Sequence, residues 1–276
     1  MTLPDNIATS VQQALLEDIG TGDVTADLIV EVSQSEATVI CREDAILSGC
    51  AWFDEVFKQV DASVKVEWHF KDGDNVPADA ILCNLSGSSR SLLTGERTAL
   101  NFVQTLSATA TATNAFVKLI KGTKADILDT RKTLPGLRLA QKYAVTCGGG
   151  ANHRVGLYDM ILIKENHIMA AGSITKAIAN ARSLHPSIKI EVETETLAEF
   201  EEACAADADI IMLDDFDLET MRKAVQNNPK GIPLEASGNV NLETVVNIAE
   251  TGVDRISIGG ITKSVEAIDL SMRFKL

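Results

Sequence analysis

IKIEVETETLAEFEEACAADADIIMLDD, residues 188–215, contains two short apolar runs separated by a segment with helical spacing. The runs IKIEVE and ADIIMLDD have the length and the β-branched content of buried strands. Between them, LAEFEEACAA (197–206) places its apolar residues on one helical face. A strand, a helix and a second strand in this order form a βα unit, whose strands pair in parallel within one sheet.

The same unit recurs through the second half of the chain, and from residue 188 onward the apolar runs return at intervals of about 21–23 residues, the length of a βα unit. The other runs are ADILDT (125–130), YDMILIK (158–164), IPLEAS (232–237) and DRISIG (254–259), and further helical segments cover 174–184 and 242–251. This number of units favours a barrel over an open sheet. No Gly-x-Gly-x-x-Gly turn follows a strand, which counts against a dinucleotide-binding sheet.

The first half of the chain mixes the apolar spacing of helices with that of strands, which is typical of a small α+β module. We expect helices over 5–19 and 51–60, strands over 37–44 and 64–70, and a short strand followed by a Gly/Ser loop within 71–87. Residues 91–121 predict one long helix, although SATATAT (107–113) locally favours a strand. The predicted domains are an N-terminal α+β domain over 1–110 and an α/β barrel over 111–276, with the last ten or so residues packing back on the first domain.

Composition excludes several classes of protein. A net charge of −14 over 276 residues argues against a nucleic-acid binder and against a partner at an anionic membrane surface. The five cysteines are odd in number and lack zinc-site spacing, which indicates reduced thiols. The sequence shows no signal-peptide pattern and no apolar run long enough for a membrane helix, so we expect a cytoplasmic protein.

Polar or glycine residues follow every strand of the predicted barrel. Active groups of parallel barrels lie at these carboxyl ends, so the residues there are the candidate site. In chain order they are Thr130, Arg131 and Lys132; Lys164; Glu193; Asp214 and Asp215; Ser237, Gly238 and Asn239; Gly259 and Gly260. Of the two adjacent aspartates only one should face inward, because side chains alternate along a strand.

Each of these positions taken alone has a structural explanation. Strand ends meet solvent, glycine turns connect strands to helices, and the three glycines of CGGGANHRVG (147–156) suit a flexible loop. The joint pattern favours a site, since all six strand ends agree. Beside His153 and Arg154, the glycine loop fits anion binding at least as well as simple flexibility.

The residue types also sort along the barrel in a chemically meaningful order. Glycine turns on the last strands leave backbone N–H groups available for a phosphate. Carboxylates in the middle suit Mg²⁺, and the cations of the first strands suit carboxylates or phosphates. From spacing alone the sequence predicts an enzyme that binds a phosphorylated sugar and a second, multiply anionic substrate, with the reaction undetermined.

Eight stretches of the chain resemble one known family. They are GDVTADL (22–28), GERTALNFVQTLSATATAT (95–113), DTRKTLPGLRLAQKYAV (129–145), GGGANHRVGLYDMILIKENHI (148–168), IEVETET (190–196), IMLDDF (211–216), LEASGNVN (234–241) and DRISIGGIT (254–262). In order and in separation they are similar to quinolinate phosphoribosyltransferase, the carboxylating nicotinate-nucleotide pyrophosphorylase. The resemblance implies the type II phosphoribosyltransferase fold, an N-terminal α/β sandwich followed by an incomplete parallel α/β barrel.

The resemblance implies a reaction and an assembly. Quinolinate and phosphoribosyl pyrophosphate would react with Mg²⁺ to give nicotinate mononucleotide, pyrophosphate and CO₂ in NAD biosynthesis. The enzyme would be a homodimer or a hexamer of dimers, each pocket being completed by the neighbouring subunit. No nucleic acid and no membrane would be involved.

The resemblance also implies a role for each matching residue. Arg97 would reach quinolinate in the partner's pocket, Arg131, His153 and Arg154 would hold the quinolinate carboxylates, and Thr130 would contact substrate. Lys132 and Lys164 would bind phosphate and act in catalysis with Glu193 and Asp214, which would position the ribose hydroxyls and Mg²⁺. The 5′-phosphate would lie against Ser237, Gly238, Asn239, Gly259 and Gly260.

Two alternatives remain at this point. A paralogue of the same fold could act on nicotinate or another anion, although retention of both RTALN (97–101) and NHR (152–154) favours the dicarboxylate. A non-catalytic anion-binding protein could keep the barrel, but the complete set of cations, carboxylates and glycine turns counts against it.

Overall fold

The computed structural model describes residues 2–275, which divide into two compact units. Unit 1 draws on Met1–Asn114, Thr133–Gly149 and Ile261–Leu276, and unit 2 on Ala115–Lys132 and Gly150–Gly260. Each unit therefore contains segments that are distant in the sequence. The domain boundary expected near residue 110 stays a prediction.

Unit 1 is built on an antiparallel sheet of four strands in the order β12-β1-β5-β3. The strands are β1 (Gln34–Cys41), β3 (Lys65–Trp68), β5 (Ile81–Ser88) and β12 (Leu270–Phe274). A separate pair is formed by β2 (Ala45–Ile46) and β4 (Asn75–Val76). Residues from the two halves of the chain thus meet in one sheet, with Ala37 opposite Leu85 on one side and Phe274 on the other.

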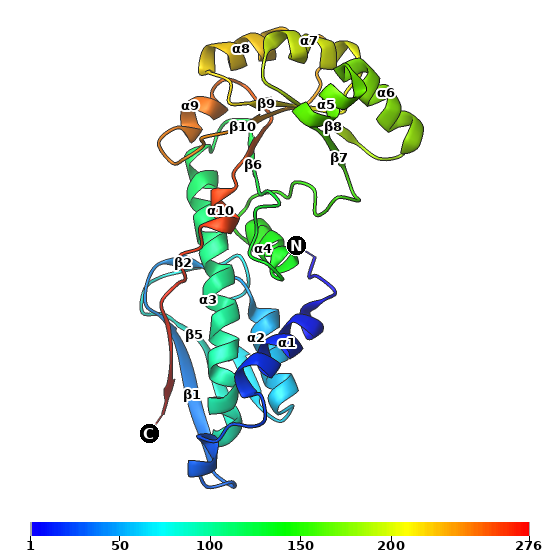
Figure 1. Cartoon of the computed structure of the whole chain (residues 1–276). Helices are drawn as coiled ribbons and strands as arrows, with labels where there is room; N and C mark the ends of the chain where they lie inside the picture. The colour runs from blue at the N-terminus through cyan, green and yellow to red at the C-terminus, as the bar shows by residue number, and fades with distance from the viewer. Residues whose placement is uncertain (1, 276) are drawn as a thin grey trace. The chain divides into compact units, whose positions relative to one another are not determined.

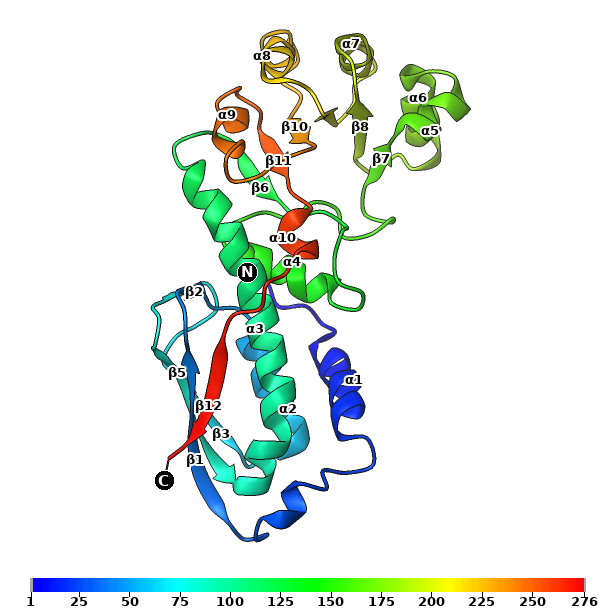
Figure 2. The same ribbon diagram turned by 60° about the vertical axis from the view of Figure 1, so that its left-hand side comes forward.

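Helices cover one face of this sheet, as Figures 1 and 2 both show. They are α1 (Ile7–Ile19), α2 (Cys50–Val60) and most of α3 (Ser89–Leu119); the unit also contains α4 (Arg138–Cys147), most of α10 (Gly260–Lys263) and a 3₁₀ turn at Ala26–Leu28. The α2 side chains Trp52, Phe53 and Phe57 are fully buried in the core. Because this core needs one apolar face from each helix, the spacing of apolar residues predicted α1 and α2 correctly.

The long helix α3 keeps its helical form through the SATATAT stretch, as predicted. Thr111 and Thr113 donate their hydroxyls to the carbonyls four residues earlier, at 2.7 and 2.8 Å, so the polar groups are satisfied within the helix. Ala110 and Thr113 are completely buried, so small residues here allow close packing. Burial therefore overrides the local strand preference of these threonines.

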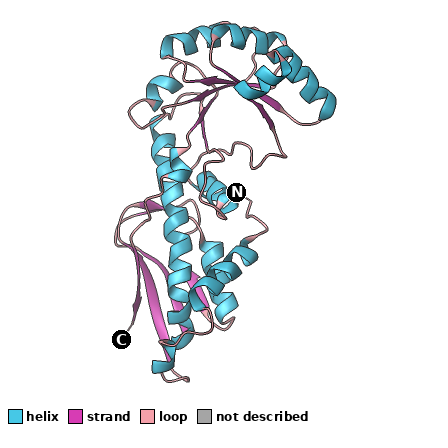
Figure 3. Cartoon of the chain, in the orientation of Figure 1, coloured by secondary structure: helices cyan, strands magenta, loops and turns pink. Residues whose placement is uncertain are grey.

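Unit 2 is a parallel sheet of six strands in the order β6-β11-β10-β9-β8-β7. The strands are β6 (Asp126–Leu128), β7 (Ile161–Ile163), β8 (Ile190–Thr194), β9 (Ile210–Asp214), β10 (Leu234–Ser237) and β11 (Arg255–Ser257). The helices are α5 (Glu165–Ala171), α6 (Ile174–Leu184), α7 (Leu197–Ala205), α8 (Leu218–Gln226) and α9 (Val245–Ala249). Helices α6, α7 and α8 lie on the outer face of the sheet (Figures 1 and 3).

Residue spacing predicted a barrel and the family resemblance implied an incomplete one, and this sheet is such an incomplete barrel. Strands β6 and β7 follow each other in the chain but lie at opposite edges of the sheet, so within residues 2–275 the ring of strands is not closed. Part of the gap beside β6 is covered by the segment before His153, where Ala151 donates its N–H to Ile127 at 2.8 Å. Because all six strands are parallel, their carboxyl ends lie at the same edge of the sheet.

Two local predictions were wrong. The expected Gly/Ser loop at the end of 71–87 is strand, because β5 continues to Ser88, which pairs with Gln34 of β1. The helix expected over 242–251 is shorter, since α9 covers Val245–Ala249.

Over the described part of the chain, no helix has both the length and the apolar character needed to span a bilayer.

Candidate active site

A cavity of about 440 Å³ lies at the carboxyl ends of the unit 2 strands, which is the size of a small-molecule site. Its lining residues are Thr130, Arg131, Lys132, His153, Arg154, Leu162, Lys164, Glu193, Met212, Asp214, Ser237 and Ser257. Nine of them were predicted as site residues, and the structure brings these nine together. Leu162, Met212 and Ser257 were missed.

One part of the cavity wall is cationic. Burial and the neighbouring Arg131 lower the pKa of the Arg154 guanidinium below its ordinary value. Glu191, Asp159 and Glu193 oppose this shift. Two guanidinium groups close enough to perturb each other create a local demand for an anion. A ligand with carboxylates at this wall would relieve the repulsion and gain charge-assisted hydrogen bonds.

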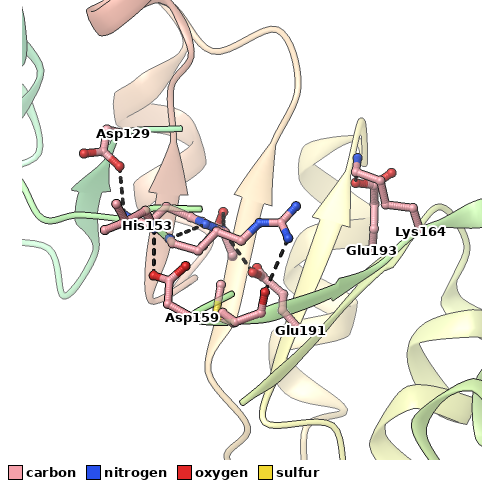
Figure 4. Close-up of polar contacts among 10 residues, drawn as sticks. Asp129, His153, Asp159, Lys164, Glu191 and Glu193 are labelled. Carbon is pink, nitrogen blue, oxygen red and sulfur yellow. Dashed lines mark hydrogen bonds and ion pairs between the residues drawn. The ribbon is translucent and has the colours of Figure 1, made fainter. Parts of the chain in front are cut away.

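The backbone of the loop that carries Arg154 is fixed by Asp129, the fully buried residue that follows β6. The His153 N–H donates to Oδ1 of Asp129 at 2.9 Å (Figure 4). The Asn152 side-chain amide donates to Oδ2 of Asp129 at 2.6 Å. Further along, Asp159 accepts the N–H groups of Val155 and Gly156. Hydrogen bonds on either side of Arg154 therefore order this loop, despite its three glycines.

A lysine and two carboxylates stand on the neighbouring strand ends. Lys164 Nζ lies 2.5 Å from Oε2 of Glu193, as an ion pair between the ends of β7 and β8 (Figure 4). Asp214, at the end of β9, also lines the cavity. Asp215 instead adopts a left-handed backbone, is exposed, and accepts a hydrogen bond from Asn239 at 3.0 Å. Of the two adjacent aspartates, Asp214 is the one that lines the cavity.

The glycine turns lie beside the cavity as follows. Ser237 lines it, whereas Gly238 and Asn239 line a neighbouring hollow between the ends of β9 and β10. Gly238 has φ of +97°, a backbone conformation that favours glycine, and an added Cβ would collide with Asp215. Gly259 packs against Lys132, since a Cβ placed there would lie 2.9 Å from the lysine Cδ.

Two predicted residues belong to other places. Arg97 is an exposed residue of α3 in unit 1 and is not among the residues that line the unit 2 cavity. Gly260 begins α10 and closes the unit 2 segment. Their assigned contacts with substrate stay predictions.

Sequence reasoning missed a pair of buried carboxylates beneath the cavity. Glu191 of β8 and Glu235 of β10 are completely buried, and both lie near Nε2 of His153, at 2.8 and 3.4 Å. Burial, and then repulsion by Glu191, raise the pKa of Glu235 to about 7. The signal in the sequence was a glutamate inside each of two strands, IEVE and LEAS, where a buried strand is expected to be apolar.

The chemistry of the donor set fits a hard divalent cation. Glu193 and Asp214 come from adjacent strands, both line the cavity, and both offer carboxylate oxygens, which Mg²⁺ prefers. The buried set of His153, Glu191 and Glu235 also has its ligand atoms within 4.8 Å of one another. Of that buried set only His153 lines the cavity, whereas Glu193 and Asp214 are half-buried and both line it. Glu193 and Asp214 are therefore the better candidates for a metal shared with substrate.

Family models match almost the whole chain. The model described as quinolinate phosphoribosyl transferase, C-terminal domain, matches residues 109–273, and the model of the N-terminal domain matches residues 23–107. Together they span both units.

Individual relatives agree with the family models. A probable nicotinate-nucleotide pyrophosphorylase (carboxylating) of Bacillus subtilis is 44% identical over 258 residues, which cover 93% of this chain and 89% of the relative. Quinolinate phosphoribosyltransferase (decarboxylating) 1b of Nicotiana tabacum is 41% identical over 284 residues, which cover 95% and 81%.

A solved structure of the nicotinate-nucleotide pyrophosphorylase from Francisella tularensis superimposes with a TM-score of 0.96 at 50% identity, over 99% of this chain and 98% of that chain. The structure of NadC from Streptococcus pyogenes gives a TM-score of 0.95 at 40% identity, over 99% and 97%. The fold and the sequence therefore point to the same relatives.

Proposed function

The chain belongs to the quinolinate phosphoribosyl transferase family, and we propose that its cavity converts quinolinate and phosphoribosyl pyrophosphate to nicotinate mononucleotide, pyrophosphate and CO₂. The observation that carries this proposal is the cavity in unit 2. Its lining joins a cationic wall and an acidic edge at the carboxyl ends of one parallel sheet, and it includes Ser237, the residue before the Gly238 turn.

Quinolinate fits the cationic wall. Its two carboxylates require two or more cations in a partly desolvated place, and Arg131 and Arg154 supply planar guanidinium groups for this. We assign the carboxylates to these two arginines, with His153 directly behind them. Thr130 contributes a hydroxyl at the same wall.

The phosphoribosyl donor fits the remaining edge. Ser237 with the Gly238–Asn239 turn, and Gly259 with Gly260, are assigned to its 5′-phosphate through backbone N–H groups. Lys132 and Lys164 are assigned to the pyrophosphate charge. Glu193 and Asp214 are assigned to the ribose hydroxyls and to Mg²⁺, which would take up leaving-group charge when bound.

The proposed chemistry needs orientation more than a reactive side chain. The C1–oxygen bond of the donor breaks, pyrophosphate leaves with the bonding electrons, and the pyridine nitrogen forms the new bond to C1. Lys132 and Lys164 stabilise the charge that develops on the leaving group. Glu193, held by Lys164, keeps negative charge near the ribose carbon as oxocarbenium character grows.

Decarboxylation follows from the product of the first step. The ring nitrogen is now cationic, so the carbon–carbon bond to the adjacent carboxylate breaks, CO₂ leaves, and the electron pair stays on the ring carbon until a proton arrives. The ring itself stabilises this carbanion, so the protein mainly excludes water and holds the ring. Arg131 and Arg154 are therefore binding groups in this proposal, consistent with their place on one wall.

The proposal is tested by incubating the purified protein with phosphoribosyl pyrophosphate, Mg²⁺ and either quinolinate or nicotinate. Release of CO₂ and pyrophosphate in equal amounts with quinolinate is the expected result. Turnover of nicotinate alone would contradict the assignment of two carboxylates to the cationic wall. Absence of turnover with both substrates, at full substrate concentrations, would contradict the proposed function.

Glu193→Gln is expected to raise the Mg²⁺ concentration needed for half-maximal turnover and to lower kcat by about 100-fold, within the usual effect of one electrostatic group in a site. The dissociation constant of quinolinate should change little, because Glu193 is not part of the cationic wall. Turnover against Mg²⁺ concentration and quinolinate titration calorimetry measure the two effects. A variant that binds quinolinate weakly but responds normally to Mg²⁺ would refute the role.

The assembly is part of the proposal, supported by the exposed position of Arg97 on α3. If Arg97 of one subunit serves the cavity of another, then the Arg97→Ala and Arg131→Ala homo-oligomers should both have strongly reduced activity. Each mixed dimer that carries one variant of each kind is expected to regain up to about half of wild-type activity, because one of its two shared sites has both arginines. Random mixing makes about half of the dimers mixed, so the whole population should regain up to about a quarter. Mass spectrometry of the mixed oligomer verifies the mixing, and lack of regained activity there would refute a shared site.

A further inference from the structure

Glu191 and Glu235 are the only glutamates in the described chain with no exposed surface. Removing two carboxylates from water costs more free energy than their packing contacts contribute to stability. Both carboxylates face one ring, that of His153, which has only 6% of its side chain exposed. The cluster thus lies directly under the cationic wall of the cavity.

The hydrogen bonds define which ring nitrogen carries the hydrogen. Nδ1 of His153 accepts the backbone N–H of Arg154 at 2.7 Å, so Nδ1 holds a lone pair and no hydrogen. The ring hydrogen is therefore on Nε2, and this nitrogen lies 2.8 Å from Oε2 of Glu191. The ring therefore has a single N–H, and the carboxylates of Glu191 and Glu235 both lie near it.

The ring also fixes Arg154. The His153 N–H is held by Asp129, and the Arg154 N–H is held by Nδ1 of the ring. At the other end of the side chain, Nη1 of Arg154 donates to the Met160 carbonyl at 3.3 Å. The direction of the guanidinium in the cavity therefore depends on the orientation of the imidazole, which in turn depends on the carboxylates below it.

We propose that Glu191, together with Glu235, is a positioning residue that fixes the His153 ring through Nε2 and thereby sets the direction of Arg154 for binding a carboxylate of the substrate. The identity of that substrate as quinolinate rests on the proposed function. In this arrangement His153 contributes to binding through the backbone of Arg154 and not through a ring N–H of its own. Glu191 and Glu235 touch no reacting atom.

The surroundings of Glu235 are consistent with this arrangement. A pKa of about 7, raised by burial and by Glu191, means that the second carboxyl holds a proton readily near neutral pH. One carboxylate, that of Glu191, can then stay charged beside Nε2, while the protonated Glu235 adds no second negative charge. A single acceptor in a defined place selects one ring orientation.

The kinetic test uses two variants of Glu191 that differ in whether they can accept a hydrogen bond. Glu191→Met removes the acceptor at similar length and is expected to raise the quinolinate KM about 10-fold, since an unmatched buried donor is left behind. The phosphoribosyl pyrophosphate KM should stay within about 2-fold, and kcat should change less than KM, because uniform binding is lost. Glu191→Gln keeps a carbonyl acceptor and should restore most of the quinolinate KM.

Thr194→Val is the matched control. Thr194 is completely buried on the same strand, and its hydroxyl donates to the Met212 carbonyl without touching His153. It should leave the quinolinate KM unchanged. Equal losses in Glu191→Met and Glu191→Gln, or equal rises in both KM values, would overturn the positioning role.

The second measurement does not depend on any variant or on turnover. Long-range ¹H–¹⁵N spectra of the wild-type protein report the tautomer of each of its four histidines, and the His153 signals are assigned by their loss in His153→Asn. A neutral ring with hydrogen on Nε2 is expected. A ring with hydrogen on Nδ1 overturns the proposal, and this measurement decides alone if Glu191→Met does not fold.

The two hypotheses fail in different ways. If wild-type protein turns over no quinolinate, the proposed function is wrong, while the ring tautomer still reports on the Glu191–His153–Arg154 arrangement. If turnover is normal and the tautomer is the other one, only the positioning role is lost.

Discussion

Arg131→Ala should reduce kcat/KM for quinolinate by a factor between about 30 and 1000, which corresponds to about 2–4 kcal/mol for the loss of one partner of a desolvated charge pair. The reason is the cationic wall, where Arg131 and Arg154 lie close enough for one to lower the pKa of the other. Without Arg131 the substrate carboxylate loses a bidentate partner, and the remaining guanidinium has no second group to orient the ring. Steady-state kinetics with varied quinolinate at saturating phosphoribosyl pyrophosphate measures the effect.

Arg182→Ala is the control for this substitution. Arg182 belongs to α6, pairs with Asp209 at 2.8 Å, and does not line the cavity. Its removal should change kcat/KM by less than about 2-fold, since surface ion pairs contribute little. Near-normal kinetics of Arg131→Ala would remove Arg131 from the quinolinate site.

The second large effect concerns stability. Glu235→Gln should raise the free energy of unfolding at pH 8 by on the order of 3 kcal/mol, because the folded-state pKa of Glu235 is raised from 4.5 to about 7. In the folded state the carboxyl binds its proton more tightly than in the unfolded state. Folding is therefore penalised progressively as pH rises from about 4.5 to about 7, and the full penalty applies above that range. Glutamine carries no charge at any pH, so the Glu235→Gln variant does not have this penalty.

Urea unfolding at several pH values between 4 and 8 tests this expectation. The stability difference between wild type and Glu235→Gln should be small near pH 4 and should grow up to pH 7. Glu201→Gln, which alters an exposed glutamate of α7, should show no such growth. A constant difference across the range would mean that Glu235 titrates normally in the folded protein.

The sequence predicted the repeated part of the fold well, and the reason is physical. Helix α6 covers the predicted residues, Ile174–Leu184, because Ser173 caps its first turn and the apolar spacing continues to its end. By contrast, β5 extends through Ser88 because of pairing with β1. That pairing depends on contacts between distant segments, and local turn preference at Gly87 carries no information about it.

The same distinction holds at the site. The residues at the strand ends could be predicted from the sequence, because a repeat of parallel strands places those ends at one edge of the sheet. Nine of the residues predicted in this way line one cavity. Glu191 and Glu235 were not found, because each lies inside a strand and its meaning appears only when β8, β10 and the His153 loop are brought together. Asp129 was missed for a similar reason, since its function is to hold a backbone segment more than twenty positions later in the chain.

The pairing of β12 with β1 has a consequence for how the polypeptide reaches this structure. A span of 239 positions separates Lys275 from Glu36, which it contacts through backbone and side chain. During synthesis, the edge of β1 that receives β12 stays open until nearly the entire barrel has left the ribosome. We therefore expect the nascent protein to need protection from aggregation late in translation, and unit 1 to acquire protease resistance only after residues 270–274 emerge.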